Sequence, residues 1–487
     1  MPCPCQTGAR LFIISEVVSM NEERKELDME IEEIAEKVPE YIATRKYAEL
    51  KDILIDMNPV DIGDLMEELP NQSLPVVYRL LPKELAAEVF VYIDSDTQEQ
   101  LIKTFSDSEL KEVIDELYID DTVDLIEEMP ASVVKRILKH TDKDMRDEIN
   151  RILKYPKDSA GSVMTTEYVD LKKNLTVEDA FLRIRRTAVD KETIYTCYVT
   201  DENRKLIGLV TVKDLLLADY SEKISDIMET NIIYVNTTDD QEYVANMFTK
   251  YDFSTIPVVD AEERLVGIVT FDDAMDVIMD ETTEDIEKMA AISQTDNEKP
   301  YLKMSALELW KKRIPWLLLL MISATFTGMI ISSFENALSS YVVLTSFIPM
   351  LMDTGGNTGS QSSVTIIRSL SLGDIEFKNL PAIIWKEIRV AVLCGATLAV
   401  TNFIKLLVID KLLLGNTQIT AAVALVVCST LVMTVLCAKV IGCTLPMLAK
   451  KIGFDPAVMA SPFITTIVDA VSLVVYFRIA TVCLHLN

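Results

Sequence analysis

The sequence contains very little histidine, and its cysteines do not follow the spacing of a metal site. Two of the 487 residues are histidine, and the close pair among the eight cysteines is Cys3 and Cys5. Structural zinc sites need four such ligands at short, regular spacings, so we expect no zinc site and a packing role for the cysteines. A Ser/His/Asp or Cys/His set and a phosphate-binding loop are also missing, which argues against an enzyme.

Positive charge is scarce as well, and the negative charge is concentrated in one part of the chain. The formal net charge is −29. Residues 1–300 contain 33 Lys+Arg and 67 Asp+Glu, a net charge of −34, whereas residues 301–487 contain 14 and 9, a net charge of +5. An acidic field of this size attracts cations and repels nucleic acid, so we expect cation partners and no nucleic acid.

Apolar segments long enough to cross a bilayer appear after Tyr301. A spanning helix needs about 20 residues. Lys and Arg are concentrated in the loops on one side of these segments, which predicts cytoplasmic N-terminal domains and an extracytoplasmic C-terminus in a multi-pass protein of the plasma (inner) membrane. We expect five spans, near Ile314–Phe334, Tyr341–Ile367, Val390–Ile409, Ile419–Ala438 and Ala457–Leu484.

Two of these segments contain residues that are unusual in a bilayer. Asp469 lies in the middle of the last one, where a carboxylate costs about 3 kcal/mol or more and usually faces a partner or a water-filled path. In the second, Asp353 precedes a string of glycines and hydrogen-bonding residues, Gly355–Ser363. We expect this string to break the helix and to line a cavity or a close helix crossing, because backbone groups in lipid must be satisfied. Together these features predict an ion pathway.

Residues 21–155 carry helix-spaced apolar positions separated by proline and acidic residues. This pattern predicts an acidic domain of stacked short helices, and Asp61–Pro70 recurs as Asp121–Pro130, as the units of a solenoid do. The carboxylates of this domain form either a solvated face or ligands for cations.

Residues 1–20 contain an apolar run that is too short and too charged for a signal peptide, and we expect a disordered extension there.

A second repeat occupies residues 158–280. Val163–Leu171 is similar to Ile227–Val235, and Gly208–Asp214 is similar to Gly267–Asp273. With the amphipathic helix and short β-branched strands between these strings, the region resembles a tandem pair of CBS modules, which bind adenosine nucleotides in the cleft between them. The Thr and Asp of each Gly-x-x-Thr-x-x-Asp string would start a helix whose cap and carboxylate can reach ribose hydroxyls.

The segment after the second string is strongly acidic. Like charges three or four residues apart destabilise a helix, and helical spacing places five carboxylates on adjacent turns: Asp273, Asp276, Asp280, Glu284 and Glu287. Water and salt would neutralise them, or a divalent cation that bridges to the acidic helical domain. We expect this helix to continue through Trp310 into the first span and to transmit a rearrangement to the pore.

The order of these parts, with the strings Gly355–Gln361 and Asp455–Asp469, resembles the MgtE family of magnesium channels over nearly everything after residue 20. The resemblance implies a homodimer with a central pore, in which Asp469 of each subunit holds a hydrated Mg²⁺. The implied pore residues are Asp469, Asp353, Gly355, Gly356, Asn357 and Gly359. The resemblance also implies regulatory Mg²⁺ sites between the cytosolic domains, at Asp120, Asp124, Asp252, Asp273, Asp276, Glu281, Glu284 and Asp285. ATP binding at the first CBS module is implied for Thr211, Lys213, Asp214 and Phe253, with Lys213 in place of a common Arg.

The sequence therefore predicts a multidomain membrane protein with a cytosolic α-helical superhelix, a tandem CBS (α+β) pair, a connecting helix and a five-helix transmembrane domain. The expected bounds are 21–155 for the helical domain, 158–222 and 223–280 for the CBS modules, 281–310 for the connecting helix and 311–487 for the transmembrane domain.

We expect a Mg²⁺-selective channel or transporter that imports magnesium into the cytoplasm. Cytosolic Mg²⁺ bound between the acidic domain and the CBS pair would close it, with modulation by ATP. Mg²⁺ loses its water reluctantly, so two Asp469 groups on a two-fold axis would hold its hydration shell; Co²⁺, Mn²⁺ and Ni²⁺ are further candidates. The alternative is a CBS-regulated secondary exchanger of divalent cations, whose second titratable site would be Asp353 with Glu335. A membrane enzyme controlled by nucleotide is less consistent with the sequence.

Overall fold

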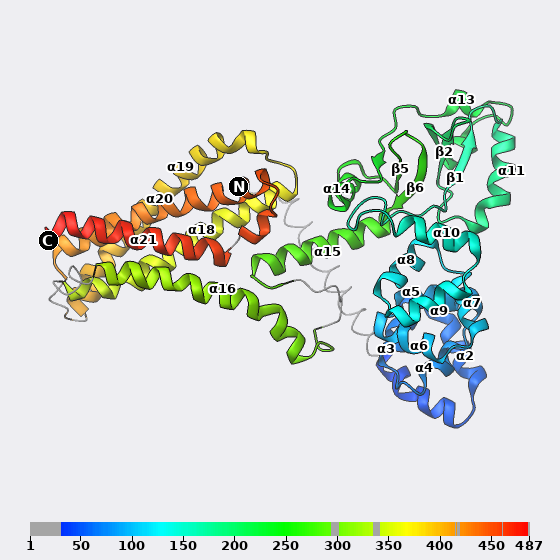
Figure 1. Ribbon diagram of the computed structural model, residues 1–487, viewed down its shortest axis with the longest axis horizontal. Helices are drawn as coiled ribbons and strands as arrows, with labels where there is room; N and C mark the ends of the chain where they lie inside the picture. Colours follow the sequence, from blue (N-terminus) through cyan, green and yellow to red (C-terminus); the bar gives the residue numbers. More distant parts are fainter. Residues whose placement is uncertain are drawn as a thin grey trace, which may run out of the picture. The chain divides into compact units, whose positions relative to one another are not determined.

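The computed structural model describes residues 31–293, 301–334, 341–413, 415, 419–459 and 461–485. The chain forms two compact units, Met1–Val277 and Ile278–Asn487. In Figure 1 the blue to green ribbon is the first unit, and the green to red ribbon is the second. Helix α15 (Phe271–Met289) starts in the first unit and ends in the second.

The first unit begins with the predicted stack of short helices. Residues 31–43 are helical. Several of the following helices begin at a residue that caps them: Asn58 caps α3, Asp94 caps α6, and Ser106 forms a capping box with Glu109 at α7. Their apolar faces form one buried core. The helices are α2 (Tyr47–Asp56), α3 (Pro59–Glu68), α4 (Leu74–Tyr78), α5 (Lys83–Tyr92), α6 (Ser95–Thr104), α7 (Asp107–Ile114), α8 (Ile119–Glu128), α9 (Ala131–His140) and α10 (Lys143–Ile152).

The two copies of the sequence repeat fold in the same way. They form the ten-residue helices α3 and α8, which bury equivalent positions: Leu65 and Met66 in α3 correspond to Leu125 and Ile126 in α8. The apolar positions therefore determine which face of each helix packs against the core. Helix α8 carries five acidic residues, and two of them, Asp120 and Asp121, lie on its first turn.

Two three-stranded sheets follow, and they are copies of one another. In each, the first two strands are parallel and the last two are antiparallel, in the orders β1-β2-β3 and β4-β5-β6. Corresponding residues have the same register, because Thr196 pairs with Thr211 as Thr255 pairs with Thr270. This symmetry confirms the predicted CBS pair. The elements are β1 (Val169–Lys172), α11 (Val177–Thr187), η1 (Ala188–Asp190), β2 (Thr196–Thr200), β3 (Leu206–Thr211), α12 (Val212–Leu217), α13 (Ile224–Ile227), β4 (Val235–Asn236), α14 (Gln241–Tyr251), β5 (Thr255–Val259) and β6 (Leu265–Thr270).

The expected continuous helix from the CBS pair into the first span is wrong. Helix α15 ends at Met289, and Ala291 follows in the left-handed region with φ 55°. The amide of Ile292 donates to the Glu287 carbonyl and that of Ala291 to the Lys288 carbonyl, the paired bonds of a Schellman end. A separate helix, α16 (Ala306–Ser333), begins at Ser305, which forms a capping box.

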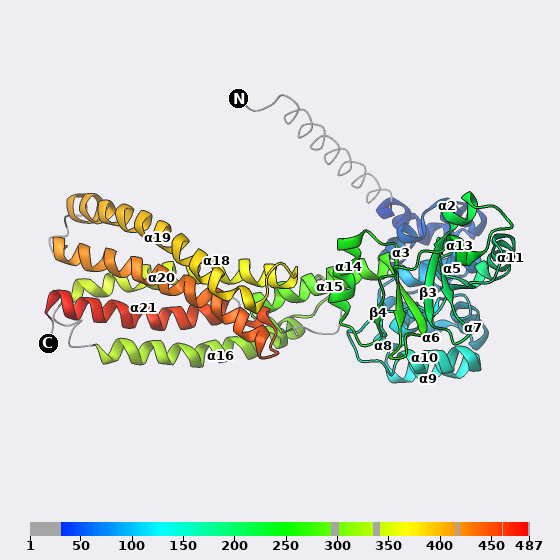
Figure 2. The same cartoon turned by 90° about the horizontal axis from the view of Figure 1, so that it is seen from above.

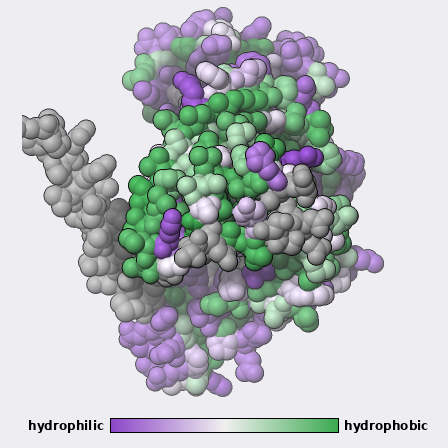
Figure 3. Space-filling view, turned by 90° about the vertical axis from the view of Figure 1, so that its left-hand side faces the viewer, coloured by the Kyte–Doolittle hydropathy of each residue, from purple (hydrophilic) through white to green (hydrophobic). Residues whose placement is uncertain are grey.

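The second unit contains long helices, of which α16, α19, α20 and α21 run alongside one another in both views (Figures 1 and 2). Among the described residues, four segments are long and apolar enough to cross a membrane: Ala306–Ser333, Phe377–Leu413, Ala421–Lys451 and Pro456–Leu484. Apolar residues also cover much of the described surface that faces the viewer in Figure 3. The elements after α16 are η2 (Val342–Phe347), α18 (Ile348–Ser371), η3 (Phe377–Asn379), α19 (Leu380–Lys405), the π-helix η4 (Leu406–Leu413), α20 (Ala421–Lys451), η5 (Pro456–Met459) and α21 (Ser461–Leu484).

Helix α18 is the second of the five expected spans, and it differs from the other long helices in composition. The expected break within it is wrong, because the helix is continuous through the glycine string. It packs against both α20 and α21. A Cβ at Gly355 would lie 2.8 Å from a Thr434 methyl group, and one at Gly356 would lie 2.8 Å from a Thr465 methyl group. The glycines therefore permit a close helix crossing, which was one of the two expected roles.

A buried ion pair also holds α18 in place. Lys439 of α20 lies 3.3 Å from Glu387 of α19, and both side chains are almost fully buried. The hydroxyl of Ser362 on α18 accepts a hydrogen bond from Lys439 at 3.2 Å and donates one to Glu387 at 2.5 Å. Charges buried in this way need a partner with good geometry, so this cluster fixes how the three helices meet.

We predict that Gly442→Ala destabilises the second unit. A Cβ at Gly442 would collide with the carbonyl oxygen of Gly359, which is backbone and cannot turn away. We expect a loss of about 1–3 kcal/mol, seen as a lower midpoint of thermal unfolding in detergent by tryptophan fluorescence, because all three tryptophans lie in this unit.

The matched control is Gly328→Ala on α16, where an added Cβ meets no atom within 4 Å. Its midpoint should not fall, since alanine favours a helix over glycine. Equal midpoints for Gly442→Ala and the wild-type protein would contradict the crossing.

Candidate cation-binding sites

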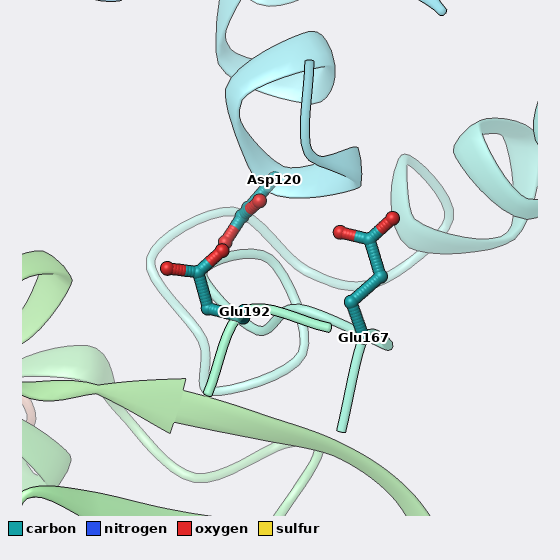
Figure 4. A group of neighbouring side chains, drawn as sticks. All are labelled: Asp120, Glu167 and Glu192. Carbon is teal, nitrogen blue, oxygen red and sulfur yellow. The ribbon is translucent and has the colours of Figure 1, made fainter. Parts of the chain in front are cut away.

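The first candidate site is a cluster of carboxylates in the first unit. One carboxylate oxygen from each of Asp120, Glu167 and Glu192 lies within 4.8 Å of the other two. Figure 4 shows Asp120 on its helix, α8, above Glu167 and Glu192, which come from two loops of the first CBS module. Carboxylate oxygens are the ligands that Mg²⁺ and Ca²⁺ prefer, so the arrangement is suited to a divalent cation.

The backbone positions these groups without neutralising them. The Ile119 amide donates to Glu167 at 3.2 Å, and the Asp121 amide donates to Asp120 at 3.1 Å. One oxygen of Glu192 is buried and has no hydrogen-bond partner among the described residues. Asp273, at the start of α15, accepts a hydrogen bond from the Thr270 hydroxyl. The cluster therefore holds several acceptors, and no basic side chain of the described part of the chain lies at hydrogen-bond distance from it.

Burial and mutual repulsion make the charged form of this cluster unfavourable. Burial raises the pKa of Asp120 well above its usual value, and the negative charge of Asp273 adds to the shift. Burial is also the main cause at the neighbouring carboxyls, whose pKa rises to about 6 for Asp121 and Asp273, and to about 7 for Asp124, Glu167 and Glu192. At neutral pH the cluster needs protons or cations to stay compact.

Farther along α15, in the second unit, Glu284 has a basic partner. Lys288 lies 2.5 Å from Glu284 and 2.6 Å from Asp455. The Ser371 hydroxyl donates to Asp285 at 3.3 Å. Lysine thus supplies part of the neutralisation that the sequence left to water, salt or a divalent cation.

The second candidate site joins α18 and α21. Asp353 lies close enough to act electrostatically on Asp469. The amide of Asn357 donates to Asp353 at 3.1 Å, and both of these side chains are exposed. Asp469 is half-buried on α21. The structure therefore brings together three of the predicted pore side chains. Glu335, the expected second titratable site of an exchanger, lies outside the described residues.

Three of the predicted nucleotide residues, Thr211, Lys213 and Asp214, lie at the start of α12, and Phe253 follows α14. Thr211 and Asp214 form a capping box, in which Asp214 accepts from the Thr211 amide at 3.0 Å and from its hydroxyl at 2.5 Å. Lys213 and Asp214 are exposed. Phe253 stacks on Tyr251, with ring centroids 5.4 Å apart.

Comparisons with known proteins cover the whole architecture. Family models match as "Divalent cation transporter" (residues 348–479), "MgtE intracellular N domain" (57–158) and "CBS domain" (160–221 and 224–280). The magnesium transporter MgtE of Thermus thermophilus is 35% identical over 93% of this chain and 99% of its own length. The chain belongs to the MgtE family. MgtE of Bacillus subtilis is 31% identical over 90% of this chain and 95% of its own length.

A solved structure of an MgtE cytosolic domain in complex with ATP is 38% identical, covers 50% of this chain and 99% of that one, and has a TM-score of 0.48. Membership of the MgtE family and the apolar helices make the chain a multi-pass membrane protein. The predicted fold class is confirmed, with helical stack, CBS pair and helical membrane domain in the expected order.

The predicted regulatory residues are divided between the two units, with Glu281, Glu284 and Asp285 in the second. Asp120, Asp124 and Asp273 lie together, and Asp276 acts electrostatically on Asp273. Asp252 ends α14 in the left-handed region, Glu281 lies on α15, and Glu284 and Asp285 have the partners described above. Sequence reasoning missed Glu167 and Glu192, which lie in loops, although Glu167 lies within the CBS repeat string. Gly355, Gly356 and Gly359 are buried in the helix crossing rather than exposed beside Asp353.

We predict that, without divalent cations, the first unit becomes less stable as pH rises from about 4 to 7. The pKa values of the cluster are raised on folding, so the folded state binds more protons than the unfolded state in this range. Stability then decreases with pH. Circular dichroism melts of the full-length protein in EDTA should show the decrease, and millimolar Mg²⁺ should remove it.

Tryptophan fluorescence provides the internal control, because it reports on the second unit alone. If the unfolding midpoint of the first unit in EDTA does not change with pH, the carboxylates of the cluster do not destabilise the folded state when they ionise, and the prediction is wrong.

Proposed function

We propose that this chain transports Mg²⁺ across the plasma (inner) membrane into the cytoplasm, as a homodimer that closes when cytosolic Mg²⁺ binds the acidic cluster. Relatives that match nearly the full chain are magnesium transporters. The lysines and arginines of the loops favour a cytoplasmic N-terminus and an extracytoplasmic C-terminus.

The observation that carries this proposal is the polar stripe on α18, defined by Asp353, Asn357, Gln361 and Arg368. Asp353, Asn357 and Gln361 lie on successive turns, and Arg368 follows about two turns later. All four are exposed, as is the apolar Val364 on the turn between Gln361 and Arg368, while the opposite face of the helix packs against α20 and α21. Polar and charged groups are costly in lipid. The stripe therefore favours a water-filled path, and a second copy of the chain is the partner that would enclose it.

The chemistry of the stripe suits a hydrated divalent ion. Mg²⁺ keeps several of its waters, so its ligands in a pore should be carboxylates and amides that accept hydrogen bonds from the hydration shell. Asp469, Asp353 and Asn357 supply such acceptors, and a two-fold axis would double them. A divalent ion gains about twice the Coulomb energy of a monovalent one there.

Regulation follows from the carboxylate cluster. At low cytosolic Mg²⁺, repulsion would separate α8 from the CBS loops; at high Mg²⁺, bound cations would hold them together. Helix α15 begins at this cluster with Asp273 and continues into the second unit, so it would carry the change. A switch from mostly open to mostly closed needs about 5 kcal/mol of differential binding, which several cooperating ions can supply. ATP bound beside Thr211 and Asp214 would modulate the same unit.

We predict that Asp469→Asn strongly reduces Mg²⁺ flux. The substitution keeps the size of the side chain and removes the charge at a half-buried position on which Asp353 acts electrostatically. Uptake into liposomes, followed with a Mg²⁺-sensitive dye, is the measurement. Asp374→Asn, an exposed carboxylate between α18 and α19, is the matched control and should transport normally. Unchanged flux in Asp469→Asn would place the selectivity site elsewhere.

We also predict that Asp120→Asn with Asp273→Asn abolishes the control by internal Mg²⁺. Without these carboxylates, cations can no longer bridge α8 and the start of α15. Flux should then stay constant as internal Mg²⁺ rises from micromolar to millimolar, while the wild-type flux falls. The control is Asp226→Asn, an exposed residue of α13. Normal closure of the double variant would refute the regulatory part of the proposal and leave transport itself intact.

A further inference from the structure

The first CBS module contains a pocket of about 410 Å³ that the proposed transport does not use. It is lined by Arg183, Lys191 and Arg204, by the polar residues Thr166 and Tyr168, and by one carboxylate, Asp170. Pockets of roughly 300–1,000 Å³ are of the size that holds a small organic ligand. Its three basic side chains are unusual in a region with the net charge of −34 given above.

Part of this positive charge has no partner in the protein. Arg183 is bonded to Asp170, through the backbone carbonyl at 2.7 Å and the carboxylate. Arg204 donates a long hydrogen bond of 3.4 Å to the Tyr168 hydroxyl. Among the described residues, the side chain of Lys191 makes no hydrogen bond or salt bridge, and its ammonium acts on Glu167 through its charge alone. The pocket therefore has an excess of donors and positive charge, which suits an anion.

The pocket is separate from the expected nucleotide site at Thr211 and Asp214. Strand β2 pairs with β3 in the antiparallel sense, with Thr196 opposite Thr211. Thr200, which also lines the pocket, is at the other end of β2. The pocket also extends along β1, because Val169 lines it and pairs with Cys197, next to Thr196. Strand β2 lies between β1 and β3, and neighbouring strands are about 4.8 Å apart, so the two sites lie at opposite edges of the sheet.

The pocket and the carboxylate cluster are back to back. Thr166 and Tyr168 line the pocket, whereas Glu167 between them faces Asp120 in the cluster. The same alternation recurs at Lys191, which lines the pocket, and Glu192, which belongs to the cluster. Successive side chains of an extended segment point to opposite sides. Two short segments thus form the wall between a basic site and an acidic one.

We propose that this pocket binds a small phosphate monoester, and that the bound anion strengthens cation binding at Asp120, Glu167 and Glu192. The second part rests on the proposed regulatory role of the cluster. A bound phosphate neutralises Lys191 and adds negative charge behind Glu167, so the cluster attracts a cation more strongly. Linkage requires the reverse as well: a bound cation strengthens phosphate binding by the same factor.

The first experiment tests the pocket alone. Full-length protein in detergent and EDTA is titrated with ribose 5-phosphate and with inorganic phosphate by isothermal titration calorimetry. We expect saturable binding to the wild-type protein. The dissociation constant should rise at least about tenfold in the double variant Lys191→Gln with Arg204→Gln. Lys191→Arg, which keeps the positive charge, should bind as the wild-type protein does. The matched control is Arg185→Gln, an exposed residue of α11, the helix that carries the pocket residue Arg183. If the wild-type protein shows no saturable binding, or if Arg185→Gln weakens binding as much as the double variant does, the proposed site is wrong. If Asp214→Asn abolishes binding, the probe occupies the nucleotide site instead, which also overturns the proposal.

The second experiment tests the linkage. The same titration with ribose 5-phosphate is repeated at millimolar Mg²⁺ with wild type and Glu192→Gln. We expect Mg²⁺ to tighten binding in the wild-type protein and to have a smaller effect in Glu192→Gln, whose binding in EDTA is retained. If Mg²⁺ tightens binding equally in both proteins, the effect comes from Mg²⁺ bound to the phosphate ester in solution, and the proposed linkage is wrong. The titration in EDTA still tests independently whether the pocket binds the phosphate ester.

Discussion

Repulsion among buried carboxylates is the constraint on which the first unit depends. Four carboxylates lie close together there: Asp120 on α8, Glu167 and Glu192 from the CBS loops, and Asp273 on α15. Within the described ranges, no basic side chain lies at hydrogen-bond distance from them. Each carboxylate loses hydration on burial, and each raises the cost of ionising the next. The compact arrangement is therefore conditional on protons or cations. A structure that is stable under one ionic condition and strained under another has the property that a sensor needs.

The second unit meets a different constraint, because its surroundings supply no hydrogen bonds. The two faces of helix α18 therefore differ: one packs against neighbouring helices, and the other carries polar side chains. Its glycines allow the backbone to approach α20 and α21, and its buried Ser362 joins the ion pair of Lys439 and Glu387. The other face carries Asp353 and Asn357. Tight packing on one face thus determines the direction in which the polar face points.

Several expectations from the sequence were confirmed because they rest on local patterns. The repeated acidic string predicted two equivalent helices, α3 and α8, and the duplicated Gly-x-x-Thr-x-x-Asp strings predicted two equivalent sheets with helix caps. The errors arose where local patterns end. The acidic helix seemed to continue toward Trp310, but α15 ends at Met289 with a residue in the left-handed region. The glycine string, which suggested a broken helix, forms a continuous one because its neighbours fill the space that side chains would occupy.

The sequence by itself determined the class of the protein: the order of its parts, the apolar segments, the acidic N-terminal region and the position of Asp469 within an apolar segment. Periodicity, hydropathy and charge depend on residues that are near one another in the chain, so they can be read without coordinates. The tertiary structure alone decided which carboxylates meet. Glu167 and Glu192 join Asp120 across long separations in sequence, and Asp252 does not. No spacing rule records such contacts, because they depend on how the separate folded elements pack.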